Sequence, residues 1–141
     1  MMPWSFVTEE LESARNYWVV TVGPGERPHS APVWGAFVAD DLFFETSPAT
    51  RKGRNLARNP AVVLHTESGD DVVIVEGLAA PFHSAPGSVN RLVEAFRAKY
   101  DGYEPDPDEW ATGSLYRVTP TVIFAWRDMP TATCWRFARH L

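Results

Sequence analysis

The sequence predicts a mainly β protein of the α+β class: a small six-stranded antiparallel barrel with helices in its connections. Six segments rich in β-branched and aromatic residues follow one another mostly as hairpins. Two segments with helical spacing interrupt this series, and no Gly-x-Gly-x-x-Gly follows the first strand, as a dinucleotide-binding parallel sheet would require. The chain has 141 residues, so residues 1–141 are expected to form a single domain.

The first half of the chain is expected to contain an opening helix and three strands. Residues 8–15 read as a short helix with Thr8 as its N-cap. Residues 17–22 and 28–38 form a hairpin around the turn at 23–26, and residues 42–46 return as a third strand. This third strand leads directly into a basic helix.

The second half is expected to add three strands and one longer helix. Residues 61–67 and 72–82 flank the turn at 68–71 as a second hairpin. Residues 86–100 show helical spacing, and the acidic, Pro-rich segment 101–113 reads as a loop or cover. Residues 114–126 form the last strand, broken by Pro120, and an aromatic tail follows.

The basic helix between residues 50 and 59 places cations where a helix dipole disfavours them. Thr50 is its expected N-cap, and Arg51, Lys52 and Arg54 occupy its first turn. One interpretation is that a phosphate-bearing ligand supplies the missing anion, held by Arg51, Lys52 and free backbone N–H groups. The other is a solvated basic face on a helix whose Leu56 packs inward with Ala57.

Composition narrows the classes of ligand. The net charge of −5 disfavours broad attraction to nucleic acid or to an anionic membrane. Four basic residues nevertheless share the acid-free octet 51–58, which suits a small acidic ligand. A single cysteine, Cys134, excludes an intrachain disulfide, and no run approaches the ~18 apolar residues of a membrane span, so a cytoplasmic protein is expected.

No side chain is predicted to act as a catalytic nucleophile or metal ligand. The four histidines are scattered without metal-ligand spacing, and neither Gly-x-Ser-x-Gly nor a P-loop occurs. The strand at 28–38 carries Pro28 and Pro32, which remove two backbone donors. An interrupted ladder near 31–34 would leave main-chain groups free to contact a flat polar ring, whereas an ordinary edge strand explains the same prolines.

These residues resemble a known family. The segments RPHSAPVWG, FFETSPATRKGRNLARNPAVVLHTE and VVIVEGLA are similar to the pyridoxamine 5′-phosphate oxidase-like flavin and deazaflavin (F420) oxidoreductases, which have the FMN-binding split-barrel fold. The resemblance extends from about Tyr17 to Phe137 and is strongest in the strand, turn and RKxRNLxxNP helix.

The resemblance implies a set of cofactor-binding positions. It assigns the cofactor phosphate to Thr46, Ser47, Thr50, Arg51 and Lys52. It places Ala31, Pro32, Val33 and Trp34 along the tricyclic ring. It also implies a homodimer with two interfacial cofactor clefts, to which the tail at Trp135 and Arg136 contributes, although Cys134 stands where a basic residue is expected.

The function expected from this resemblance is hydride transfer from reduced F420 to a small organic acceptor. FMN is the alternative cofactor, and a non-catalytic flavin- or haem-binding split barrel is the alternative class. A true pyridoxamine phosphate oxidase would need a second basic subsite, for which Arg136 and Arg139 are the tail candidates. Because the cofactor carries the hydride, no catalytic side chain is required.

Overall fold

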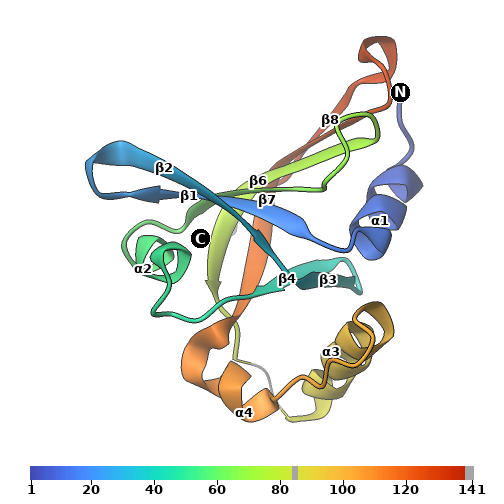
Figure 1. Cartoon of the computed structure of the whole chain (residues 1–141). Coiled ribbons are helices and arrows are strands. Elements are labelled where there is room, and N and C mark those ends of the chain that lie inside the picture. Colours follow the sequence, from blue (N-terminus) through green and yellow to red (C-terminus); the bar gives the residue numbers. More distant parts are fainter. Residues whose placement is uncertain (84–85, 139–141) are drawn as a thin grey trace.

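Eight strands build one antiparallel sheet that curls around a hydrophobic interior (Figure 1). The computed structural model describes residues 1–83 and 86–138. The strands are β1 (Tyr17–Gly23), β2 (Arg27–Val33), β3 (Gly35–Val38), β4 (Asp41–Glu45), β5 (Ala61–His65), β6 (Val72–Pro81), β7 (Leu115–Trp126) and β8 (Thr133–Arg136). Their order is β2-β1-β5-β6-β7-β4-β3, and β8 pairs with β7 outside this path. The predicted split barrel is confirmed.

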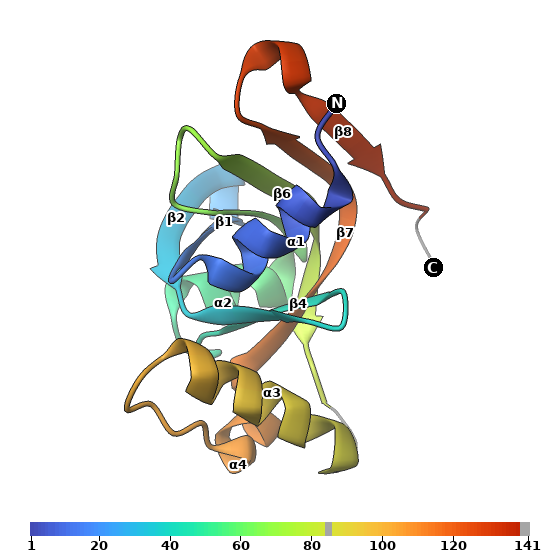
Figure 2. The same cartoon turned by 90° about the vertical axis from the view of Figure 1, so that its right-hand side faces the viewer.

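Helices fill the connections between these strands. They are α1 (Trp4–Ser13), α2 (Arg51–Arg58), α3 (Pro86–Lys99) and α4 (Pro107–Glu109), with short helical turns η1 (Pro24–Glu26), η2 (Trp110–Ser114) and η3 (Met129–Thr131). Figure 2 shows α3 and α4 at one end of the sheet and the β7–β8 hairpin projecting from the other. The segment expected to be a loop, 101–113, thus contains α4 and most of η2.

The prediction of six strands was low by two, for separate reasons. The expected long second strand ends at Val33 and resumes at Gly35 as β3, so Trp34 lies at a break. Gly35 is required there, because a Cβ would lie 2.4 Å from the Phe43 carbonyl oxygen and 2.6 Å from the Tyr17 ring. The aromatic tail also pairs with β7, with Trp135 opposite Ile123.

The two prolines of β2 occupy the edge of the sheet. Pro28 lies opposite Val22 and Pro32 opposite Trp18 in an unbroken β1–β2 register. Because β2 pairs only with β1, its prolines need no hydrogen bond on the open side. The β1–β2 ladder is therefore continuous through Val33, as expected for an ordinary edge strand, and within the predicted range 31–34 the strand is interrupted only at Trp34.

The predicted break at Pro120 is a bulge within a continuous strand. The β6–β7 register shifts between Glu76 and Gly77, with Gly77 opposite Pro120. A Cβ on Gly77 would lie 2.3 Å from the Thr119 carbonyl oxygen, so only glycine permits this close approach. The strand continues to Trp126 on the far side of the bulge.

The opening helix begins earlier than predicted. It starts at Trp4 after Pro3, whose fixed φ suits a helix start. Thr8 lies inside the helix, and its hydroxyl donates to the Ser5 carbonyl oxygen at 3.0 Å instead of capping the N-terminus. The error arose because Thr8 with the following glutamates resembles a cap, whereas apolar burial of Phe6 and Val7 extends the helix backwards.

Two hydrophobic clusters hold the fold together. The larger one fills the curl of the sheet and includes α1 through Phe6, Val7 and Leu11. The smaller one lies where α3, through Leu92 and Phe96, meets strand residues such as Phe43, with Trp110 from η2. Helix α2 contributes Leu56 to the larger cluster and contacts β1 beside the open β1–β2 hairpin.

Candidate functional site

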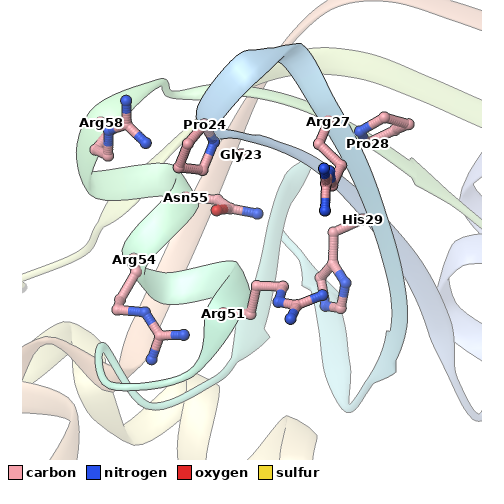
Figure 3. Close-up of a pocket in the computed structure, with 9 residues that line it drawn as sticks. All are labelled: Gly23, Pro24, Arg27, Pro28, His29, Arg51, Arg54, Asn55 and Arg58. Carbon is pink, nitrogen blue, oxygen red and sulfur yellow. The ribbon is translucent and has the colours of Figure 1, made fainter.

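A cleft of about 600 Å³ lies between α2 and the β1–β2 hairpin (Figure 3). Basic and neutral side chains surround it. Its lining consists of Gly23, Pro24, Arg27, Pro28, His29, Arg51, Arg54, Asn55 and Arg58. We call it the arginine cleft, because four arginines and no carboxylate line it.

One wall of the arginine cleft is a single face of α2. Arg51, Arg54, Asn55 and Arg58 follow the i, i+3, i+4, i+7 spacing that aligns side chains along a helix. The opposite face buries Leu56 and Gly53, whereas Ala57, which was expected to pack inward, is exposed. The basic residues of α2 therefore form a directed stripe along the cleft.

The other wall comes from β2. Arg27 and His29 are alternate residues and share one face of the strand. Figure 3 shows Arg51 reaching from α2 toward His29 across the cleft. Cations on two separate elements thus converge on one space, which creates a field that favours anions.

A buried hydrogen bond joins the two elements beneath the cleft. The Asn55 side-chain amide nitrogen donates to the Thr21 hydroxyl at 3.0 Å, and both residues are almost fully buried. Thr21 lies opposite His29 in the β1–β2 ladder, so this bond ties α2 to the strand pair that carries Arg27 and His29. It fixes the spacing between the walls.

The start of α2 is organised by hydroxyl groups. Thr50 caps the helix as predicted: its Oγ1 accepts from the Gly53 N–H at 3.2 Å and donates to the Ser47 carbonyl oxygen at 2.7 Å. The buried Thr46 hydroxyl lies 3.0 Å from Thr50 Oγ1 and donates to it, because the Thr50 proton is already used. The N–H groups of Arg51 and Lys52 remain at the open first turn.

The electrostatics of the cleft act on His29. Partial burial lowers its pKa below the usual range, and the positive charges of Arg51 and Lys52 lower it further. The imidazole is consequently neutral at pH 7. A bound anion would offset the positive charges of Arg51 and Lys52 and raise the pKa of His29 again. Protonation of His29 and anion binding are therefore coupled.

The residues predicted to hold the cofactor lie in three places: at the start of α2, at the end of β2 and in the tail. Arg51 lines the arginine cleft, and Thr50 caps the helix beside it, with Thr46 and Ser47 in the preceding turn. Lys52 is half-buried and does not line the cleft. Residues 31–34 lie further along β2 and at its end, outside the cleft lining.

Within residues 31–34, the side chains have distinct environments. Pro32 is exposed, Ala31 is half-buried, and Val33 belongs to the larger core cluster. Trp34 is 37% exposed and stacks on Tyr100, with ring centroids 4.4 Å apart and an interplanar angle of 9°. This pair presents a flat aromatic surface.

Groups around Trp34 hold this surface in place. Tyr103 meets Trp34 edge-on, and the Arg15 guanidinium carbon lies 5.5 Å from the Trp34 ring centroid. The Tyr103 hydroxyl donates to a Glu45 carboxylate oxygen at 2.6 Å. Burial raises the pKa of Glu45, although the hydrogen bond from Tyr103 opposes this shift.

The tail residues lie elsewhere in the same chain. Trp135 packs edge-on against Trp4 of α1, with ring centroids 5.5 Å apart, and Arg136 is exposed at the end of β8. In Figure 1, β8 and α2 occupy different sides of the molecule. Arg139 lies outside the described residues.

Sequence reasoning did not select Arg27, His29 or Asn55 as site residues. Arg54 was noted as a first-turn cation and Arg58 as part of the basic octet, but neither was predicted to bind the cofactor. The signal for α2 was available in the helical spacing of residues 51, 54, 55 and 58. The contribution of β2 required knowledge that the hairpin faces α2.

The described residues contain neither a metal-binding cluster nor a membrane-spanning helix. No group of three or more His, Cys, Asp or Glu side chains gathers there in a way that could hold a metal ion. Within the same part of the chain, every helix is too short or too polar to cross a lipid bilayer.

Comparisons with known proteins identify the family of this chain. The family model for pyridoxamine 5′-phosphate oxidase matches residues 5–127. A pyridoxine/pyridoxamine 5′-phosphate oxidase from Granulibacter bethesdensis is 33% identical over 120 residues, covering 63% of this chain and 55% of that protein. The chain therefore spans about half the length of this curated relative.

Solved structures share the fold at low sequence identity. A structure named F420 Reductase has a TM-score of 0.61 at 24% identity and covers 82% of this chain and 93% of its own. A haem-binding protein from Mycobacterium smegmatis has a TM-score of 0.69 at 13% identity, covering 96% and 59% respectively. With the family match over most of its length, the chain belongs to the pyridoxamine 5′-phosphate oxidase family of flavin-binding split barrels.

Proposed function

We propose that this protein is an oxidoreductase that transfers a hydride from reduced F420 to a small organic acceptor. The observation that carries the proposal is the arginine cleft, where four arginines on two elements face one another with no carboxylate in the lining. F420 combines a flat ring, a phosphate and an acidic tail, and each of these parts finds a matching surface on the chain.

The phosphate fits the start of α2. The Thr50 cap leaves the first-turn N–H groups of the helix open, and Arg51 stands beside them in the cleft. Backbone N–H groups at a helix N-terminus favour a phosphate through both hydrogen bonds and the dipole. We assign Arg51 as the principal side-chain contact, with Lys52 adding a more distant charge.

The acidic tail fits the remainder of the α2 stripe. Arg58 lies seven residues beyond Arg51, which corresponds to about 10 Å along a helix. A ligand with one phosphate engages only the first part of this wall, whereas one that also carries carboxylates engages Arg54 and Arg58. This length of the basic wall favours F420 over FMN.

The ring is assigned to the surface beyond the cleft on β2. Ala31 and Val33 continue the β2 face that carries Arg27 and His29, and Trp34, just beyond the strand, forms a flat stacked pair with Tyr100. Bound F420 would supply the hydride. The chain's own contribution is to orient the ring, to hold the acceptor near it and to exclude water.

FMN is the alternative cofactor, favoured by the 33% identity to a pyridoxine/pyridoxamine 5′-phosphate oxidase. Its single phosphate fits Arg51 and the start of α2 equally well. A non-catalytic carrier is the second alternative, supported by the fold shared with a haem-binding protein. Both alternatives predict binding without F420-dependent turnover.

We further propose that the working unit is a homodimer in the cytoplasm. The arginine cleft is open to solvent, and the exposed Trp34 surface has a protein wall on one side only. A second copy would cover such a site, and aromatic residues concentrate binding energy at interfaces. Residues Trp135 and Arg136 are the proposed contribution of the tail to the partner's cleft.

The experiment is a comparison of F420 and FMN binding to the same apo-protein. Isothermal titration gives both affinities, and stopped-flow mixing of the reduced complex with quinones, enones and tetrapyrroles measures reoxidation. We expect tighter binding of F420 and faster reoxidation by at least one acceptor. Tight FMN binding without F420 binding would reverse the cofactor assignment, and binding without accelerated reoxidation would favour the carrier.

One substitution separates the two cofactors. Arg58→Gln should weaken F420 binding by about 1 to 2 kcal/mol, the value of a charge-assisted hydrogen bond at a partly exposed site. It should leave FMN binding unchanged, because a single phosphate at Arg51 does not reach Arg58. Arg91→Gln, at an exposed arginine of α3, is the matched control.

A further inference from the structure

Lys99 is a half-buried amine that the proposed cofactor site does not use. The chain contains only two lysines, Lys52 and Lys99. Lys99 ends α3, and its Nζ donates to the Gly35 carbonyl oxygen at 2.8 Å and to the Tyr17 hydroxyl oxygen at 3.3 Å. The Tyr17 hydroxyl donates in turn to the Leu11 carbonyl oxygen, so it acts as an acceptor toward the lysine.

Within the part of the chain that the structure describes, no carboxylate lies within ion-pair distance of this amine. The ion pairs between described residues belong to Arg97, Arg117 and Arg127, and none involves Lys99. Its Nζ instead lies 4.3 Å from the Tyr17 ring centroid and 5.5 Å from that of Tyr100.

Burial, opposed by the more distant charge of Glu67, lowers the pKa of Lys99 to about 8. The other ionisable groups that face this region are Tyr17 of β1, Tyr100 at the end of α3, Arg15 after α1 and Glu12 of α1. Burial raises the pKa of both tyrosines, so neither is charged at neutral pH. Arg15, whose guanidinium lies over the Tyr100 ring, adds a second positive charge rather than a counter-ion.

The two hydrogen bonds account for both N–H groups of the amine in its neutral form. A neutral primary amine has two N–H groups and one lone pair, and here the two acceptors match the two N–H groups. The lone pair is then available to an electrophile. A lysine with this chemistry is the type that forms imines with carbonyl compounds.

Lys99 also has space beside it. A groove of about 370 Å³ runs between α1 and α3 and is lined by Lys99 together with Ala36, Phe37, Ala95 and Ala98. Glu12, on the α1 side, is the one acidic residue in this lining. The lining combines apolar groups, which suit a short hydrocarbon chain, with the polar side chain of Ser13. The single carboxylate, that of Glu12, disfavours an anionic ligand.

We propose that Lys99 is a nucleophilic amine that binds small neutral aldehydes or ketones in this groove as an imine. The ammonium first releases a proton to water. The Nζ lone pair then forms a bond to the carbonyl carbon, the resulting carbinolamine loses water, and the C=N double bond replaces C=O. Atoms and charge balance without an oxidant or a reductant, and hydrolysis reverses the step.

Trapping with a reductant tests this proposal on the intact protein. The protein is incubated at pH 7.0 with propanal and sodium cyanoborohydride, and peptide mass spectrometry follows labelling of Lys99, Lys52 and the N-terminal amine separately. We expect Lys99 to be labelled about tenfold or more faster than Lys52, because the lowered pKa of Lys99 leaves more of its amine neutral at this pH. The Lys99 rate should saturate with propanal and rise with pH around a midpoint near 8.

Each other outcome overturns the proposal. Equal or slower labelling of Lys99 means that the amine is shielded, and a midpoint near 10 means that it is an ordinary ammonium. A rate linear in propanal up to high concentration means that the groove does not bind the carbonyl compound. Lys52→Arg is the matched control and should leave Lys99 labelling unchanged, whereas Lys99→Arg should abolish the fast labelling.

Discussion

Arginine, rather than lysine, supplies the charge of the proposed cofactor cleft. Its guanidinium presents paired N–H groups in a plane, which match the two oxygens of a phosphate or carboxylate. Arg51, Arg54 and Arg58 repeat this group along α2, and Arg27 adds it from β2. The cleft is thus suited to a ligand with several separate anionic groups.

The first prediction separates the two cations at the start of α2. Replacing both Arg51 and Lys52 with Ala should weaken cofactor binding by about 2–4 kcal/mol, since charge-assisted hydrogen bonds contribute roughly 1.5–3 kcal/mol each. Most of this loss should appear in Arg51→Ala alone, because Arg51 lines the cleft and Lys52 does not. Titration calorimetry measures the three variants; unchanged affinity in the double variant would remove the phosphate assignment.

The second prediction concerns pH. In the free protein, burial and the charges of Arg51 and Lys52 hold the pKa of His29 below its ordinary value. Because the unfolded chain then binds this proton more tightly, the free energy of unfolding decreases as the pH falls through about 6.5. A bound anion raises this pKa, so binding takes up a proton, and affinity should increase by up to about tenfold between pH 7.5 and 5.5.

The comparison with His29→Gln isolates this effect. The ligand's own titration is the same for both proteins, so the difference between their pH profiles belongs to His29. The variant should have the flatter profile, with the two affinities converging at high pH. Parallel profiles would show that His29 does not sense the ligand.

Part of this site could be predicted from sequence and part could not. Thr50 as cap and Arg51 beside it follow from local rules, because capping and the helix dipole depend on neighbouring residues. His29 looked isolated because its partner in space, Arg51, is 22 positions away in the sequence. The convergence of a strand face with a helix stripe is a tertiary property, and spacing within one segment does not encode it.

At the scale of elements, the seating of α2 depends on a glycine inside the helix. Gly53 faces the turn that precedes α2, and a Cβ there would lie 2.5 Å from the Ser47 carbonyl oxygen and 2.7 Å from the Pro48 Cα. Both atoms belong to the backbone, so they cannot move aside as a side chain would. The close approach brings the start of the helix against the turn that orders it.

The third prediction tests this approach. Gly53→Ala should lower the free energy of unfolding by about 1–3 kcal/mol through overpacking, even though alanine is the better helix former by about 1 kcal/mol. Gly69→Ala is the control, since a Cβ there would meet nothing within 4 Å, and it should change stability by less than about 0.5 kcal/mol. Chemical denaturation measures both, and a stabilised Gly53→Ala variant would contradict the packing argument.

The elements themselves were largely predictable, and the errors share a cause. The hairpins, α2 and α3 follow from periodicity and turn residues. The break at Trp34 and the added strand β8 do not, because each depends on contacts with distant residues: Trp34 stacks on Tyr100, and β8 pairs with β7. Local pattern identifies a strand but does not say where another element will interrupt or extend it.

At the scale of the whole molecule, the outer side of the sheet carries an apolar surface. Side chains of β1, β5, β6 and β7 line a groove of about 260 Å³ there. Its apolar residues include Val20, Ala61, Val63 and Leu78, and its polar ones are Glu76 and Thr121. Leu78 is 37% exposed, a high value for leucine in a strand. Contiguous apolar surfaces of this kind mark association sites.

The fourth prediction is that this surface takes part in the proposed homodimer. Leu78→Glu should convert a dimer to a monomer at micromolar concentration, because it replaces an apolar contact with a second carboxylate beside Glu76, and two like charges are costly to desolvate in an interface. Met129→Glu is the control, since Met129 is 65% exposed on η3, away from this surface. Light scattering measures the molar mass of the wild-type protein and of both variants. A wild-type protein that is monomeric with cofactor bound would contradict the dimer.

The edge position of β2 has a consequence for how the protein behaves at high concentration. The ladder to β1 uses the N–H groups of alternate residues, so the prolines occupy positions whose N–H groups would point to the open side. Between Pro28 and Pro32, only Ser30 can therefore donate outward. A strand from another chain cannot pair along such an edge, which protects the protein from strand-by-strand aggregation and leaves the cleft face of β2 to contacts made by side chains.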